Sequence, residues 1–82
     1  MKGEKHMDEV MEILEEARPD VDFTKETRLI DDEILDSFDI ISIVGELNDA
    51  FDIEINVNDL LPENFNSAEA IFELVEKLRQ EA

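Results

Sequence analysis

One hydroxyl side chain, that of Ser37, stands where an amphipathic helix is predicted to begin. The stretch EILDSFDII spans residues 33–41, and Ser37 lies between Asp36 and Phe38 within it. A serine at such a position commonly caps the helix, because its side-chain oxygen accepts a hydrogen bond from a free backbone N–H. The same hydroxyl could instead be a point of covalent attachment. The rest of the sequence has to distinguish the two interpretations.

Other residue types that support enzymatic chemistry are scarce or poorly placed. The chain has no cysteine, which excludes disulfides, thiolate metal sites and cysteine nucleophiles. Its one histidine, His6, falls in a segment predicted to be frayed, where no acid–base partner can be held at hydrogen-bonding distance. The two glycines, Gly3 and Gly45, form no phosphate-binding loop. We therefore predict that the protein has no catalytic residues and is not an enzyme.

Calcium binding is an alternative that the acidic residues raise. Segment 52–63 places oxygen-bearing side chains at several ligand positions of an EF-hand loop, namely Asp52, Glu54, Asn56, Asn58 and Glu63. However, the sixth position, which needs glycine for its sharp turn, is Val57, and Pro62 interrupts the expected exit helix. The pattern therefore predicts no metal site.

The charge distribution indicates which classes of partner the protein can bind. The chain has 24 acidic and seven basic residues, a formal charge of −17, and residues 29–76 contain no lysine or arginine. Such a surface repels nucleic acids and anionic membranes and attracts basic protein surfaces. No run approaches the roughly 18 apolar residues of a membrane span, and no secretory signal is visible. We therefore expect a cytoplasmic monomer with neither nucleic-acid binding nor membrane insertion.

Two helices are predicted in the first two thirds of the chain. Apolar residues recur at helical spacing over residues 5–17, and Pro19 ends that pattern. A long connection, residues 20–36, follows. The second helix has the clearest apolar stripe, made of Ile40, Ile41, Ile43, Val44, Leu47 and Phe51. Either Asp36 or Ser37 would be its N-cap.

In the last third of the chain, the sequence pattern predicts a connector and two further helices. Residues 52–57 alternate like a strand, but with no second strand to pair they are interpreted as extended. A short helix is expected within residues 59–65. Asn66 is predicted to cap the last helix, with Glu69 in the capping-box position, and that helix runs to Gln80. The sequence thus predicts one all-α domain, residues 1–82, a small four-helix bundle with three main helices.

A family resemblance follows from the segment around Ser37. The stretch LIDDEILDSFDIISIVGELNDAFDIEI, residues 29–55, resembles the core of acyl and peptidyl carrier proteins, whose second helix opens with an Asp-Ser-apolar triplet. Asp36-Ser37-Phe38 matches that triplet, and LPENFNSAEAI, residues 61–71, is similar to the family's passage into the last helix. Ile34 replaces a glycine that is common in the family. Phe38 is more similar to the D-alanyl carriers than to the fatty-acid carriers.

The resemblance implies a cofactor and a set of partners. The serine of the triplet, here Ser37, would be esterified with 4′-phosphopantetheine, whose thiol carries an acyl or aminoacyl group as a thioester. The partners implied are a phosphopantetheinyl transferase, an acyl- or aminoacyl-activating ligase, and an acyltransferase or synthase. Acids of the second helix would contact basic docking patches on these enzymes: Asp36, Asp39, Glu46 and Asp49.

The local chemistry suits that implied role. The N-terminus of a helix offers free N–H groups and a partial positive charge, which would accommodate a phosphodiester on Ser37. We therefore predict that Ser37 is both helix cap and attachment point. Phe38 and Ile41 are candidates to line an apolar groove that shelters the cargo. The alternative hypothesis is an unmodified acidic interaction module, similar to a DNA mimic, that has no use for Ser37.

Overall fold

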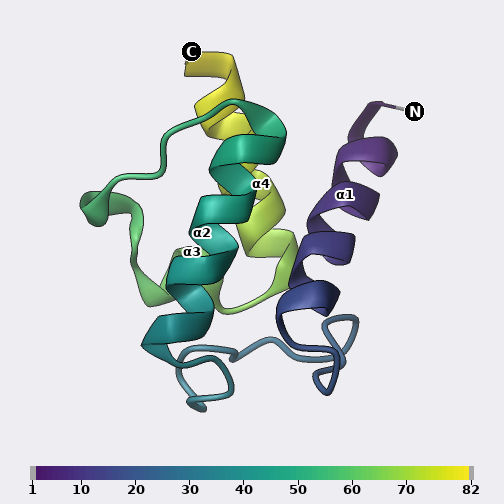
Figure 1. Ribbon diagram of the computed structural model, residues 1–82, viewed down its shortest axis with the longest axis vertical. Coiled ribbons are helices and arrows are strands. Elements are labelled where there is room, and N and C mark those ends of the chain that lie inside the picture. Colours follow the sequence, from purple (N-terminus) through teal and green to yellow (C-terminus); the bar gives the residue numbers. More distant parts are fainter. Residues whose placement is uncertain (1, 82) are drawn as a thin grey trace.

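The computed structural model describes residues 2–81, and the side chains of residues 6–80 within them. It contains α1 (Lys2–Ala17), α2 (Ser37–Phe51), the 3₁₀ turn η1 (Val57–Asp59), α3 (Pro62–Phe65) and α4 (Ala68–Glu81), shown in Figure 1. No strand occurs among these described residues. The predicted all-α bundle with three main helices is confirmed, and residues 53–56 are an extended connector as expected.

The three long helices pack side by side around one core (Figure 1). Helix α1 contacts both α2 and α4, and the short α3 lies against α4. The long connection between α1 and α2 crosses one end of the bundle, where α2 begins. This arrangement places the N-terminus of α2, and Ser37 with it, at that end of the molecule.

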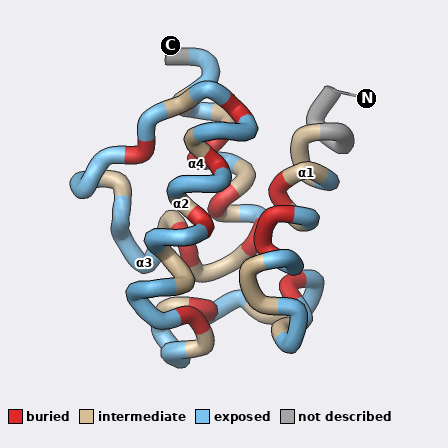
Figure 2. Tube along the Cα trace, viewed as in Figure 1, coloured by how far each residue is buried: buried red, intermediate tan, exposed pale blue. Residues whose placement is uncertain are grey.

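The core is aliphatic with three phenylalanines, and every long helix contributes buried residues to it (Figure 2). Helix α2 buries Ile43, Leu47 and Phe51. Ile40 and Val44 lie half-buried at the edge of this stripe. Ile41 does not belong to the stripe as predicted, since 67% of it is exposed. Ile41 is one residue from Ile40 and so about 100° around the helix, which turns it away from the core.

Asn66 does not cap α4 as predicted. The cap is the next residue, Ser67, whose Oγ accepts a hydrogen bond from the Ala70 N–H at 3.1 Å. The Asn66 side chain reaches instead to the long connection, where its Oδ1 accepts from the N–H groups of Ile30 and Asp31 at 3.0 and 3.1 Å. Its backbone carbonyl also accepts from the Leu29 N–H at 2.8 Å. Asn66 therefore ties the connection before α2 to the start of α4.

Helix α1 begins at Lys2, three residues before the predicted start, so the expectation that His6 lies in a frayed end is wrong. His6 Nδ1 lies 3.1 Å from Glu76 Oε2 on α4, and its ring meets the Phe51 ring edge-on with centroids 5.9 Å apart. Burial alone would raise the pKa of Glu76, but hydrogen bonds with His6 and Arg79 outweigh it and lower that pKa. His6 thus fastens α1 to α4 and α2.

Candidate functional site

The first turn of α2 is closed by a reciprocal pair of hydrogen bonds between two aspartates. The Asp39 N–H donates to Asp36 Oδ1 at 2.9 Å, and the Asp36 N–H donates to Asp39 Oδ2 at 3.2 Å. This is a capping box in which Asp36, with extended backbone, is the N-cap. The prediction that Ser37 caps the helix is therefore wrong. Ser37 is the first helical residue, and its hydroxyl is not needed to hold the helix end.

Ser37 is exposed at a helix end that still has unused donors. The Asp36 side chain and carbonyl accept the N–H groups of Asp39 and Ile40, at 2.9 and 3.1 Å. Within residues 2–81, the N–H groups of Ser37 and Phe38 find no acceptor. Two free amides at the positive end of a 15-residue helix are suited to hold an anion beside the Ser37 hydroxyl. The site therefore fits a phosphodiester on that oxygen.

A tight turn directs the chain into this helix. The N–H groups of Ile34 and Leu35 both donate to the Leu29 carbonyl, at 2.9 and 3.0 Å, and buried Leu35 anchors the turn in the core. Glu33 takes a left-handed conformation, with φ of 58°, which favours glycine. Ile34, at the place where related carriers often have glycine, keeps a negative φ. The departure at Ile34 therefore causes no backbone strain.

Arg18, just after α1, fastens this turn and α2 together. Its Nη1 donates to Asp39 Oδ2 at 2.6 Å and to the Ile34 carbonyl at 3.0 Å, while Nε and Nη2 donate to Asp20. The hydrogen bonds to Asp20 and Asp39 raise the pKa of Arg18, and the bond from Arg18 lowers the pKa of Asp20. Sequence reasoning missed this role. The available signal was that Arg18 is the one basic residue between positions 6 and 24.

Asp39 is consequently a poor candidate for partner docking, contrary to the sequence expectation. Its side chain is only 16% exposed, and its Oδ2 is shared by Arg18 and the Asp36 N–H. A partner's basic group would have to displace Arg18. The other three predicted docking acids, Asp36, Glu46 and Asp49, are exposed on α2 or at its cap.

The apolar surface beside Ser37 has two parts. Phe38 and Ile41 project into solvent, 80% and 67% exposed, and do not line a groove as predicted. A groove of about 100 Å³ includes one residue of α2, Ile40; it is lined by Ile30, Ile40, Leu60, Leu61, Pro62 and Phe65. Leu60 and Leu61 were also missed, because the groove forms only when the chain after η1 folds back toward α2.

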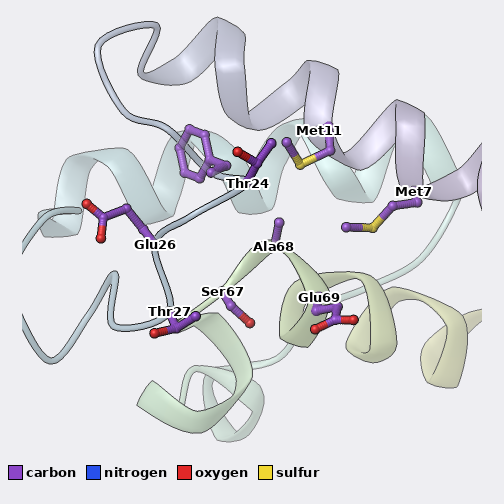
Figure 3. A pocket seen from close by; sticks show the side chains of 9 residues that line it. Met7, Met11, Thr24, Glu26, Thr27, Ser67, Ala68 and Glu69 are labelled. Carbon is purple, nitrogen blue, oxygen red and sulfur yellow. The ribbon is translucent and has the colours of Figure 1, made fainter.

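A larger hollow, of about 360 Å³, lies elsewhere, between α1, the long connection and the start of α4 (Figure 3). Its apolar lining is formed by Met7, Met11, Phe23 and Ala68, and Thr24, Ser67 and Glu69 are among the polar residues around them. No residue of the segment 36–41 lines it. It therefore does not belong to the site at Ser37.

The described residues show neither a metal cluster nor a membrane span. The described residues contain no group of three or more His, Cys, Asp or Glu side chains placed to hold a metal ion. The candidate calcium segment forms the left-handed end of α2 at Asp52, an extended stretch, and η1. Among the described helices, none has the length and apolarity that crossing a membrane requires.

Comparison with known proteins identifies the family. The phosphopantetheine attachment site family matches residues 7–75 of the chain. The chain belongs to this family. It is also 36% identical over 72 residues to a D-alanyl carrier protein of Streptococcus sanguinis strain SK36, covering 87% of this chain and 91% of that protein.

Membership establishes the general role of this phosphopantetheine-binding protein. Its cofactor is covalently attached 4′-phosphopantetheine, and its role is that of a carrier protein. Carriers of this family work with ligases and transferases and are generally not catalysts themselves. The attached group supplies a thiol that can hold cargo as a thioester. At the start of α2 this chain offers an exposed hydroxyl, that of Ser37, and the unpaired N–H groups of Ser37 and Phe38.

Proposed function

We propose that this protein carries an acyl or aminoacyl group as a thioester on 4′-phosphopantetheine attached to Ser37, and delivers it to partner enzymes. The observation that carries the proposal is the geometry of the α2 N-terminus. Asp36 caps the helix, which leaves the exposed Ser37 hydroxyl available, and the N–H groups of Ser37 and Phe38 have no acceptor and could donate to a phosphate on it.

The surface around Ser37 supports transient docking of partner enzymes. Asp36, Glu46 and Asp49 are exposed acids, and Phe38 and Ile41 add apolar area near the attachment point. Charge complementarity speeds association with basic patches, while the small apolar contact keeps affinity modest. Both properties suit a protein that moves between a transferase, a ligase and an acceptor enzyme.

The groove that includes Ile40, three residues after Ser37 on α2, favours a small cargo. Its volume of about 100 Å³ is well below the roughly 300 Å³ at which pockets usually enclose drug-sized molecules. An amino-acid side chain the size of a methyl group needs no sheltering cavity, whereas a long acyl chain would require the groove to open. The D-alanyl carrier that the chain resembles points in the same direction. We therefore propose a short aminoacyl or acyl group.

Loading assays test the proposed function. The phosphopantetheinylated protein is incubated with ATP and either a D-alanine-activating ligase with D-alanine or a fatty-acyl ligase with a long-chain acid. We expect hydroxylamine-labile loading of the short cargo, and none on Ser37→Ala. Loading by the long chain alone would overturn the cargo class, and loading of Ser37→Ala would overturn the site.

The acidic interaction module remains the competing function. It uses the same exposed acids but needs no hydroxyl, so Ser37→Ala would bind its basic partner as the wild type does. A carrier whose partners act on the pantetheine arm loses productive turnover with that substitution. Measuring turnover with the wild type and Ser37→Ala separates the two functions.

A further inference from the structure

We propose that Arg18 is a positioning residue for the modification of Ser37: it holds the α2 N-terminus in place and neutralises Asp39 there. This inference rests on the proposed function at Ser37. Arg18 is distant in sequence from the Asp-Ser-Phe triplet, and nothing in that triplet requires an arginine at the end of α1.

The contacts of Arg18 converge on the two sides of Ser37. Its Nη1 donates to the Ile34 carbonyl, in the turn before the site, and to Asp39 Oδ2, in the helix after it. The same Asp39 oxygen accepts the Asp36 N–H at 3.2 Å. One guanidinium nitrogen therefore hydrogen-bonds both to the turn before Ser37 and to the capping box that sets the position of Ser37.

Arg18 also changes the electrostatics at the place of the phosphate. The capping box brings two carboxylates, Asp36 and Asp39, to the helix end, and a phosphodiester on Ser37 adds a third negative group. With residues 29–76 lacking any basic side chain, charge compensation has to come from outside that segment. Arg18 supplies it through the 2.6 Å contact with Asp39. Asp20, on the far side of the guanidinium, holds Arg18 in that orientation.

The planar guanidinium is well suited to this task. It directs separate N–H groups to Asp20 on one side and to Asp39 and the Ile34 carbonyl on the other. A lysine ammonium carries the charge on a single nitrogen and cannot reproduce this fork. Arg18→Lys should therefore retain the charge compensation but loosen the geometry.

The test compares phosphopantetheinyl transfer onto wild type, Arg18→Gln and Arg18→Lys, with coenzyme A and one transferase. The matched control is Arg28→Gln, which removes one positive charge from the same connection but only the exposed contact with Asp32. We expect Arg18→Gln to lower kcat by about tenfold, since small misplacements of a reacting group have effects of this order or larger. Arg28→Gln should leave kcat unchanged, and Arg18→Lys should lie between.

A second measurement, the change in Tm on modification, distinguishes positioning of the site by Arg18 from a general contribution of Arg18 to stability. The change in Tm on modification is measured for each variant. Without Arg18 the added phosphate is less well compensated, so modification should lower the Tm of Arg18→Gln more than that of the wild type. Introducing Asp39→Asn into Arg18→Gln removes the uncompensated carboxylate, and this extra loss of Tm should disappear.

The outcomes are distinguishable from failure of the proposed function. If the wild type is not modified, the proposed function at Ser37 is wrong. If the wild type is modified and folded Arg18→Gln has the same kcat and the same change in Tm, the role of Arg18 is wrong. If Arg18→Gln does not fold, Arg18→Lys decides: a kcat equal to that of the wild type overturns the proposal.

Discussion

The strongest stability prediction concerns Asn66, where sequence and structure assign different roles to one side chain. A cap role predicts that Asn66→Ser is nearly neutral, because serine caps a helix about as well as asparagine. The structure predicts a substantial loss. Serine has a shorter side chain with one oxygen, which cannot reach the N–H groups of Ile30 and Asp31 together.

The magnitude follows from the bonds that are lost. The Asn66 side chain accepts from Ile30 and Asp31 and donates to Asp31 Oδ2, at 3.0, 3.1 and 3.2 Å. Each such bond contributes a net 0.5–1.5 kcal/mol as a rule, and two of the three are exposed, so the expected loss is about 2 kcal/mol. For a domain of this size that corresponds to roughly 8–16 °C in Tm.

Thermal or urea unfolding of Asn66→Ser and Ser67→Ala provides the assay. Ser67→Ala removes the cap seen in the structure and should cost about 1 kcal/mol. Amide exchange at Leu29, Ile30 and Asp31 should accelerate in Asn66→Ser and not in Ser67→Ala. A neutral Asn66→Ser together with a silent Ser67→Ala would refute the reasoning and restore Asn66 as the cap.

Three further predictions test the backbone, the core and one ion pair. Glu33→Gly should raise the free energy of unfolding by about 0.5–1 kcal/mol, because φ at Glu33 is 58° and glycine adopts this left-handed conformation without strain. The control Asp32→Gly removes the same charge at a negative φ and should lower the free energy of unfolding. Leu47→Ala removes most of a fully buried side chain and should lower the free energy of unfolding, measured in urea, by about 3 kcal/mol. Its control, Ile41→Ala at an exposed position, should change that free energy by less than about 0.5 kcal/mol. The pKa of Glu76 is lowered by folding, so its ionised form stabilises the protein above its ordinary value of 4.5, and this contribution is lost as the pH falls below that value. The stability advantage of the wild type over Glu76→Gln should accordingly be present at pH 7 and disappear in acid; an advantage that persists in acid would contradict the assigned cause.

The helical framework was predictable because it depends on local periodicity. The apolar spacing of α1, α2 and α4 repeats over three or more turns, so the fold class and the start of α2 within one residue followed from the sequence. Ile41 was misassigned because the apolar pattern of α2 is wider than its buried face. An apolar residue at the margin of a stripe is placed by the neighbouring elements, which the pattern does not contain.

The contacts that position the site were not predictable in the same way. Arg18 and Asp39 are 21 residues apart, and Asn66 and Ile30 are 36 apart. Polar side chains at such separations meet only because a long connection folds across the end of the bundle. The cap was ambiguous for a local reason. Asp36 and Ser37 are both good cap residues. Asp36 is the cap because the side chain of Asp39, three positions later, accepts a hydrogen bond from the Asp36 N–H and completes a capping box.

The central claim is that Ser37 is the point of attachment. Intact-protein mass after incubation with coenzyme A and a broad-specificity phosphopantetheinyl transferase tests it directly. Ser37→Ala is measured alongside, with Ser42→Ala as a control because Ser42 is also an exposed serine of α2. We expect the wild type and Ser42→Ala to gain one phosphopantetheinyl group and Ser37→Ala to gain none. A folded wild type that stays unmodified with several transferases, or a Ser37→Ala variant that is still modified, would contradict the claim.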